Sequence, residues 1–224
     1  MSKLKEMIAA SHWGRRLAPE QQRRVELETI ERKVAKGAPA CRKGEAPEYW
    51  LGVVDGLVKM TGLSATGKET TFTGITSSGW FGEGTLLKNE LRRYDVIALR
   101  DSQIAYMPRA TFMWLLDSSI EFNRFLLTQL NERLGQFIAT VEYDRLLGPD
   151  ARVARCLASL FNPTLYPGTG PLLAISQEEI GHLAGLSRQR VNHALQQLEQ
   201  AKLLRIEYGG ITVLDLEGLK RFEG

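Results

Sequence analysis

The chain has few of the residues that build metal centres. Its 224 residues include two cysteines, Cys41 and Cys156, and three histidines, all dispersed along the sequence. A structural zinc site or an iron–sulfur cluster needs several clustered cysteine or histidine ligands, and no CxxC pair is present. We therefore expect no metal site.

Long apolar runs are also missing. No run approaches the roughly 20 residues that span a bilayer. The N-terminal segment MSKLKEMIAASHWGRRLAPEQQRR lacks the apolar core and small residues of a signal peptide. These absences predict a cytoplasmic protein with no membrane partner.

Catalytic motifs are absent as well, because the sequence has no nucleophile elbow, no HExxH and no dinucleotide fingerprint. The segment GLSATGKE, which begins at Gly62, fits G-x-x-x-x-G-K as far as Lys68. A phosphate-binding loop then requires Ser or Thr, and it lies between a strand and a helix. Here Glu69 follows, and strand-like runs flank the segment on both sides. We predict a hairpin loop, no catalytic residues and no enzyme activity.

The composition is that of a folded globular protein, with 43% hydrophobic and 25% charged residues. The length suits one large domain or two small ones. The net charge of +3 is compatible with nucleic-acid binding but does not require it.

A strand-like texture extends from about Val25 to Met107. Short runs rich in Val, Ile, Thr and aromatic residues alternate with glycine-containing turns, which predicts a small antiparallel barrel or roll. The runs are VELETIERKVAKG, YWLGVVDGLVKMTG, ETTFTGITSSGW and YDVIALRDSQIAYM. The preceding segment has helical spacing, and Pro19 is placed to open a second short helix.

A long helix is predicted from Glu121 to Leu147. Its apolar residues recur in steps of three and four, as in the a/d seam of a coiled coil. They are Leu127, Leu130, Leu134, Phe137 and Val141. At 1.5 Å per residue, about 25 residues extend roughly 40 Å. The helix could simply pack on its own domain, but we favour a parallel dimer seam.

Gly148 and Pro149 break this helix, so we divide the chain into residues 1–118, 119–147 and 150–224. In the last part, the SQEE segment at Ser176 is a capping box that opens a short helix. Gly185 ends this helix, and Ser187 caps the next one. Two short helices joined by a tight turn indicate a helix-turn-helix, and LLRIEYGGITVLDL then forms a hairpin wing.

The second helix of this unit carries polar residues opposite its apolar stripe. They are Arg188, Gln189, Arg190, Asn192 and His193, and residues 187–195 contain no acid. Such a helix enters the major groove, where arginine pairs with guanine and glutamine or asparagine with adenine. Ser176 and Gln177 open the first helix, where backbone N–H groups favour a phosphate. The alternative is a protein-contact module with solvated arginines.

The segment ISQEEIGHLAGLSRQRVNHALQQLEQAKLL resembles the DNA-binding part of the cyclic AMP receptor protein/FNR (Crp/Fnr) family of bacterial transcription regulators, and the resemblance covers nearly the whole chain. It implies an α+β fold: an N-terminal antiparallel β-roll like a cyclic-nucleotide-binding domain, a long dimerisation helix and a C-terminal winged helix-turn-helix. It further implies a homodimer that binds palindromic double-stranded DNA and positions RNA polymerase.

Three residues match the base-reading positions of this family: Arg188, Gln189 and His193. The cyclic AMP receptor protein has Arg, Glu and Arg there, so the resemblance implies a retained guanine contact and a different operator. Arg190 is expected to contact phosphate. The rival hypothesis is an effector-binding interaction module without DNA-binding activity.

The effector site of the family is matched in part by FGEGTLLKNELRRYD. Gly82 and Glu83 fit the Gly-Glu pattern, and Arg92 best fits the phosphate-binding arginine, with Arg93 as the other candidate. Arg93 replaces the following Ser or Thr. The two hydroxyl positions on the dimer helix become Phe137 and Ile138. These departures argue against the ordinary cyclic AMP mode.

Two alternatives for the site stay open. A cyclic dinucleotide or an acidic metabolite could use Arg92 and Arg93 together, or the site is vestigial and both arginines pair with Glu83 or Asp95. The redox branch of the family carries an N-terminal cysteine cluster that this sequence lacks. The haem branch needs axial ligands in the sensor domain. His12 is the only histidine in the sequence before the break, which argues against haem. Cys41 is either a lone redox thiol or, as is usual in a roll, a packing residue.

Overall fold

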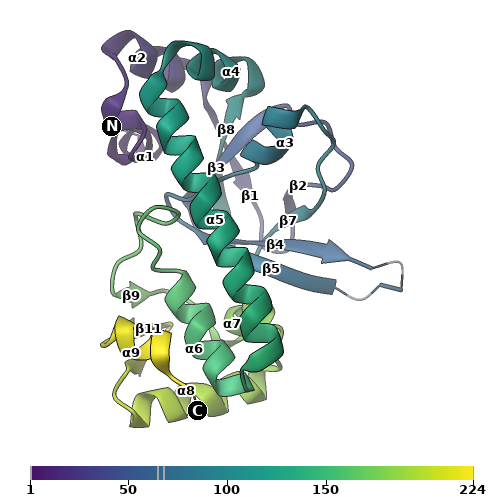
Figure 1. The fold of residues 1–224 in the computed structure, drawn as a ribbon, viewed down its shortest axis with the longest axis vertical. Helices are drawn as coiled ribbons and strands as arrows, with labels where there is room; N and C mark the ends of the chain where they lie inside the picture. Colours follow the sequence, from purple (N-terminus) through teal and green to yellow (C-terminus); the bar gives the residue numbers. More distant parts are fainter. Residues whose placement is uncertain (1, 65, 68, 224) are drawn as a thin grey trace.

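The structure is a computed structural model that describes residues 2–64, 66–67 and 69–223. It has the expected α+β architecture, with an N-terminal β-roll, a long central helix and a C-terminal helical unit (Figure 1). The GLSATGKE segment joins two antiparallel strands, as expected for a hairpin. Lys68, on which the phosphate-loop alternative depended, lies outside the described residues.

Short helices precede the roll: α1 (Lys3–Ala10), the 3₁₀ helix η1 (Gly14–Arg16) and α2 (Pro19–Glu28). Pro19 occupies the first turn of α2, as predicted. The prediction that strands begin at Val25 was wrong, because Val25 is a fully buried residue of α2. Its burial against the aromatic core outweighs the weak strand preference of valine.

The roll consists of two four-stranded antiparallel sheets. In the first, the strand order is β1 (Ile30–Val34), β8 (Ser102–Pro108), β3 (Tyr49–Asp55) and β6 (Trp80–Phe81). In the second, it is β2 (Pro39–Cys41), β7 (Asp95–Ala98), β4 (Leu57–Leu63) and β5 (Glu69–Thr76). Apolar residues of both sheets, such as Val53, Val58 and Ile104, share one buried cluster. The short helix α3 (Glu83–Lys88) follows β6.

The run YWLGVVDGLVKMTG forms two strands that belong to different sheets. The chain turns between them at Gly56, whose φ of +112° is a conformation that other residues rarely adopt. A Cβ atom at Gly56 would also collide with the side chain of Ser102. Glycine is therefore required where the chain crosses from β3 to β4.

After the roll, α4 (Arg109–Ser118) leads into α5 (Ile120–Leu146), a helix of 27 residues. The side chain of Ser119 caps α5 by accepting from the Phe122 N–H. Aromatic rings fill the space between this helix, the N-terminal helices and the roll. Trp13, Trp50 and Trp80 contact one another there, with ring centroids 4.4–5.5 Å apart.

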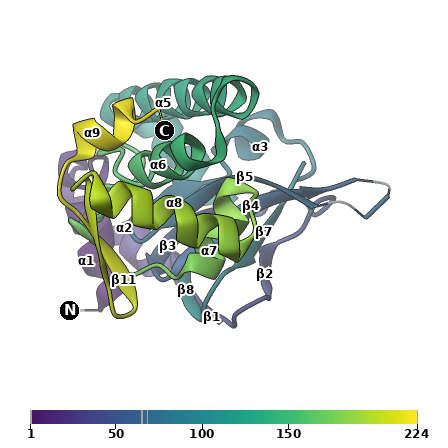
Figure 2. The same cartoon turned by 90° about the horizontal axis from the view of Figure 1, so that it is seen from below.

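The C-terminal unit begins at α6 (Pro149–Ser159) and contains α7 (Gln177–Ala184) and α8 (Arg188–Gln200). Its small sheet has the strand order β10 (Leu204–Glu207), β11 (Gly210–Val213) and β9 (Leu172–Leu173), and α9 (Leu216–Arg221) ends the described chain. The predicted hairpin wing therefore has a third, short strand. Seen from below in Figure 2, α8 lies across the lower end of the molecule.

The core of the C-terminal unit extends into the roll. Leu57 and Leu99 of the roll belong to the same buried cluster as Ile180, Val191 and Leu195 of the C-terminal helices. The two parts are therefore packed together. Among the helices of the described residues, none combines the length and apolar character needed to cross a membrane.

Candidate DNA-binding face and effector site

Helices α7 and α8 form the predicted helix-turn-helix. The Ser176 hydroxyl accepts from the Glu179 N–H at 3.2 Å, while the Glu179 carboxylate accepts from the Ser176 N–H at 2.7 Å. This reciprocal capping box opens α7. Gly185 ends it with a φ of +64°, and Ser187 caps α8 by accepting from the Arg190 N–H. The local signals therefore determine both helix starts.

A small residue on α7 allows the two helices to approach. A Cβ atom at Gly181 would lie 2.8 Å from the carbonyl oxygen of Leu186, closer than such contacts allow. Beneath the turn, Ile180, Val191 and Leu195 are fully buried. This packing leaves the first turn of α8 on the surface, where Arg188 and Gln189 are exposed.

Arg190 and His193, two further candidate DNA-binding residues, lie beside a carboxylate. Asp150, in the first turn of α6, accepts from Arg190 Nη2 at 2.8 Å. His193 Nδ1 lies 3.5 Å from the other oxygen of Asp150 and 3.1 Å from Arg190 Nη1. Residues 187–195 contain no acidic residue, but the fold brings the carboxylate of Asp150 beside them. Sequence reasoning missed Asp150 because it is 40 residues from Arg190.

The candidate phosphate contacts at the start of α7 are placed differently from one another. Ser176 is exposed, whereas Gln177 is half-buried and donates from Nε2 to Asn192 Oδ1 at 3.1 Å. Asn192 was expected to face outward with the other polar residues of α8. Its contact with Gln177 instead joins the two helices of the unit.

In the roll, Arg92 is buried and held by its own protein. Its Nη2 donates to the Tyr49 carbonyl at 2.5 Å, and its Nη1 donates to the Thr85 hydroxyl at 3.5 Å. Gly82, with a φ of +90°, leaves the space that the Arg92 guanidinium occupies, because a Cβ atom there would collide with Nη1. Gly82 and Arg92 are therefore neighbours, as the resemblance implied.

Glu83 is only 2% exposed, and its charge is compensated by a residue that sequence reasoning missed. Arg133 Nε donates to Glu83 Oε1 at 3.3 Å, and Arg133 Nη2 donates to the Trp80 carbonyl at 2.9 Å. Burial lowers the pKa of Arg133, but the charge of Glu83 and the phenols of Tyr166 and Tyr94 offset this, so its pKa is raised. The guanidinium remains charged.

A signal for Arg133 was present in the sequence. The buried residues of α5 recur mostly in steps of three and four along one face of the helix. They are Phe122, Phe125, Leu126, Gln129 and Arg133. The last two of them are a glutamine and an arginine. A charged residue that continues an inward-facing stripe predicts a buried polar partner.

Arg93 does not join Arg92 in the roll. Its side chain is 69% exposed, and it donates to the Glu90 carboxylate at 2.7 Å. Asp95, the other partner considered for the two arginines, accepts instead from the backbone N–H of Lys43. Neither the joint use of Arg92 and Arg93 nor their pairing with Glu83 or Asp95 describes this conformation.

The outer face of α5 carries an apolar stripe. Leu127, Leu134 and Val141 are 69%, 57% and 51% exposed, and Leu130 is half-buried. Phe137 lies elsewhere, because it packs against the core between the two sheets. Ile138, which is 60% exposed, continues the stripe in its place.

Both cysteines are free thiols; Cys41 is buried and Cys156 is half-buried. Burial raises the pKa of Cys41 to about 11 and that of Cys156 to about 12. At neutral pH both stay protonated, and the thiolate is the reactive form. Of the two alternatives for Cys41, the geometry favours packing over a redox thiol.

Two family models match the chain over most of its length. The cyclic nucleotide-binding domain matches residues 31–119, and the Crp-like helix-turn-helix domain matches residues 151–222. The first contains the roll, and the second contains α7 and α8. The fold and these matches define the class of protein: a DNA-binding transcription regulator with a cyclic-nucleotide-binding domain, and not an enzyme.

Relatives and solved structures are similar to this chain over most of its length. The cyclic AMP receptor protein of Thermus thermophilus is 28% identical, over 92% of this chain and 86% of the relative. A cAMP-activated global transcriptional regulator of Pasteurella multocida is 27% identical, over 72% of this chain and 78% of the relative.

Among solved structures, the Thermus thermophilus catabolite activator protein covers 94% of this chain and 98% of its own, with 25% identity and a TM-score of 0.52. FixK2 of Bradyrhizobium japonicum covers 88% of this chain and 98% of its own, with 20% identity and a TM-score of 0.72, and shows the shared fold. The chain belongs to the Crp/Fnr family of transcription regulators.

Proposed function

We propose that the chain binds a two-fold symmetric operator as a homodimer. The exposed apolar stripe of α5 supports the dimer, since Leu127, Leu134, Ile138 and Val141 recur at seam spacing on a face that its own protomer leaves uncovered. A two-fold dimer presents two recognition helices to two half-sites of a palindrome. In this proposal residues 1–118 sense, 119–147 dimerise and 150–224 bind DNA.

The exposed first turn of α8 carries the proposal for base reading. Arg188 and Gln189 are at the helix N-terminus, the end that reaches base edges in a helix-turn-helix. Arg188 reads a guanine through its O6 and N7 atoms, and Gln189 reads a neighbouring base. Ser176, Gln177, Ser187 and Arg190 contact the backbone phosphates.

Asp150 gives Arg190 and His193 a second role in this proposal. In the free protein the carboxylate compensates the positive charge of Arg190 and also lies 3.5 Å from His193 Nδ1, so approach of a phosphate competes with Asp150 for Arg190. His193, the third base-reading position, therefore contacts DNA only after it leaves Asp150. The affinity for DNA includes the cost of this exchange.

For the roll, we favour operator binding that does not need cyclic AMP. The two charged residues that match the family pocket, Glu83 and Arg92, are engaged by Arg133 and by the Tyr49 carbonyl. Phe137 packs into the roll where the family places a hydroxyl. A cyclic nucleotide would have to displace these internal contacts. The DNA-bound dimer then acts on transcription through RNA polymerase.

Operator selection from a random duplex pool tests this function. The full-length protein is incubated with the pool alone and with a panel of cyclic mono- and dinucleotides. We expect the same palindrome with and without nucleotides. A palindrome that emerges with one nucleotide alone would refute effector-independent binding, and a pool that yields no palindrome would refute the symmetric operator.

A single substitution tests base reading. Arg188→Ala should weaken binding by about 1–3 kcal/mol and relax base choice at one position of each half-site. Arg93→Ala, which removes an exposed arginine of the roll, is the matched control and should leave the operator unchanged. Equal loss on all sequences would show that Arg188 contacts phosphate instead of a base.

A further inference from the structure

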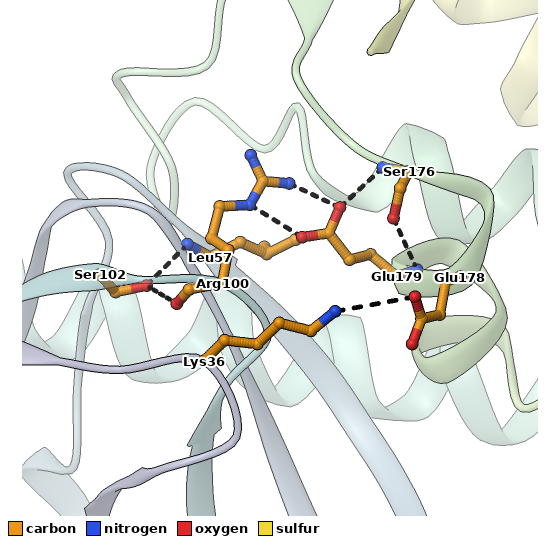
Figure 3. A network of polar contacts seen from close by, with 7 residues as sticks. All are labelled: Lys36, Leu57, Arg100, Ser102, Ser176, Glu178 and Glu179. Carbon is orange, nitrogen blue, oxygen red and sulfur yellow. Dashed lines mark hydrogen bonds and ion pairs between the residues drawn. The ribbon is translucent and has the colours of Figure 1, made fainter.

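The first turn of α7 is tied to the roll by a bidentate ion pair. Arg100, in the loop between β7 and β8, donates from Nε to Glu179 Oε1 at 2.8 Å and from Nη2 to Glu179 Oε2 at 2.7 Å (Figure 3). Two parallel N–H···O bonds fix the relative orientation of both groups, which a single contact does not. Glu179 is 7% exposed and the Arg100 side chain is 32% exposed, so solvent screens the pair only in part.

Both ends of this pair are anchored. Glu179 Oε2 also accepts from the Ser176 N–H, so the carboxylate joins the ion pair to the start of α7. On the roll side, the Ser102 hydroxyl donates to the Arg100 carbonyl at 2.8 Å and accepts from the Leu57 N–H at 3.4 Å (Figure 3). A continuous set of polar contacts therefore runs from the start of β4 to the helix-turn-helix.

A second ion pair lies beside the first but is weaker. Lys36 Nζ lies 3.7 Å from Glu178 Oε2, and both side chains are more than half exposed. Exposed pairs of this kind contribute little. It offers a control that changes charge at the same contact without touching the bidentate pair.

Apart from this pair, α7 meets the roll through apolar contacts: Ile180 shares a buried cluster with Leu57 and Leu99, and the Leu183 side chain lies against Gly74 of β5. Leu165 and Tyr166 anchor the loop after α6 in the core of the roll, but a proline- and glycine-containing segment separates them from Ser176. On another side, α7 borders an open cleft of about 1040 Å³ between β5, α5 and α6. Apolar packing thus holds α7 against the roll but is not directional, whereas the bidentate Arg100–Glu179 pair fixes the relative orientation of the two groups.

We propose that Arg100 is a positioning residue for DNA binding: it holds α7, and with it α8, at the angle that sets the distance between the two recognition helices of the dimer. This inference rests on the proposed symmetric homodimer. With the pair closed, Arg188 and Gln189 remain exposed and available to DNA. Opening the pair leaves both helices folded but lets the unit turn about the break at Gly148.

The test measures the preferred spacing of two half-sites. Full-length protein is titrated with duplexes that carry the selected half-sites at spacings differing by single base pairs. Glu179→Gln is the sharpest variant, because glutamine preserves the capping box with Ser176 and removes the charge. Arg100→Ala removes the other partner, Arg100→Lys retains charge without the bidentate geometry, and Lys36→Ala is the control.

We expect the wild type and Lys36→Ala to prefer one spacing. Glu179→Gln and Arg100→Ala should bind that spacing on the order of ten-fold more weakly and lose the preference over neighbouring spacings. Arg100→Lys should be intermediate. Trypsin should also cut faster after Arg145, next to the break, in both variants.

Two outcomes overturn different claims. Wild-type spacing profiles and unchanged cleavage after Arg145 in Glu179→Gln and Arg100→Ala would overturn the positioning role. If the wild type binds single half-sites as well as paired ones, the symmetric operator fails. The cleavage rate after Arg145 then still decides whether the pair holds the C-terminal unit in place.

Discussion

Arg133→Met should strongly destabilise the roll, because it leaves the Glu83 carboxylate buried without a cation. The side chains of Arg133 and Glu83 are 10% and 3% exposed, so water cannot replace the lost partner. Methionine retains much of the volume of arginine and isolates the effect of charge from that of an empty cavity. The change also removes the bond from Arg133 Nη2 to the Trp80 carbonyl.

The expected loss is about 3–5 kcal/mol of the free energy of unfolding, the usual cost of breaking a buried ion pair from one side. For a chain of 224 residues, each kcal/mol lowers Tm by about 2–4 °C. The melting temperature should therefore fall by about 6–20 °C. Glu83→Gln combined with Arg133→Met removes both charges and should recover most of this loss.

Urea unfolding followed by far-ultraviolet circular dichroism measures these differences. Arg93→Met is the matched control, because it breaks an ion pair with an exposed carboxylate and should leave the midpoint unchanged. The reasoning would be refuted by a single variant as stable as the wild type. A double variant no more stable than Arg133→Met would also refute it, since the loss would then not arise from an unpaired Glu83.

Three further predictions concern the dimer, the DNA face and the thiols. Leu134→Lys should weaken self-association at least about tenfold, because each protomer loses an apolar contact, and a variant still dimeric in dilute sedimentation would contradict the stripe. Asp150→Asn should release Arg190 and raise DNA affinity at low salt, with a salt dependence steeper by about one ion per protomer; an unchanged slope would argue against the exchange. Cys41, with a pKa raised to about 11, should be about 100-fold less ionised at pH 8 than a thiol with the ordinary pKa of 9.0. Its alkylation should accelerate as pH rises toward 11, whereas rapid alkylation at pH 7 would contradict its burial.

The parts of this fold that could be predicted from the sequence are those with local causes. The capping serines at 176 and 187 and the glycine at 185 act within one or two turns of chain, so both helices of the DNA-binding unit were located correctly. The strand texture and its glycine turns indicated the antiparallel roll for the same reason. Alternation and capping are properties of neighbouring residues.

The parts that could not be predicted depend on contacts between distant segments. Arg133 and Glu83 are 50 residues apart, and Arg190 and Asp150 are 40 apart, so spacing along the chain says nothing of either pair. Val25 was assigned to a strand because local preference is weak where burial decides the conformation.

The long helix shows a third kind of difference from the prediction, one of angular phase. Steps of three and four fit two faces of α5 equally well, and only packing distinguishes them. Phe137 belongs to the inner face that Arg133 continues, whereas Ile138 belongs to the outer stripe. A one-residue difference in phase thus moves a side chain from the exposed stripe of α5 into the roll.

The tryptophan cluster gives the roll an intrinsic fluorescent probe. Three of the four tryptophans of the chain, Trp13, Trp50 and Trp80, are buried side by side, and the sequence has none after Trp114. The Trp50 indole donates to Glu83 at 3.5 Å, and the Trp80 carbonyl accepts from Arg133. Any molecule that separates Glu83 from Arg133 changes the surroundings of two indoles. Tryptophan fluorescence therefore reports on the roll without a label, because the DNA-binding unit has no tryptophan.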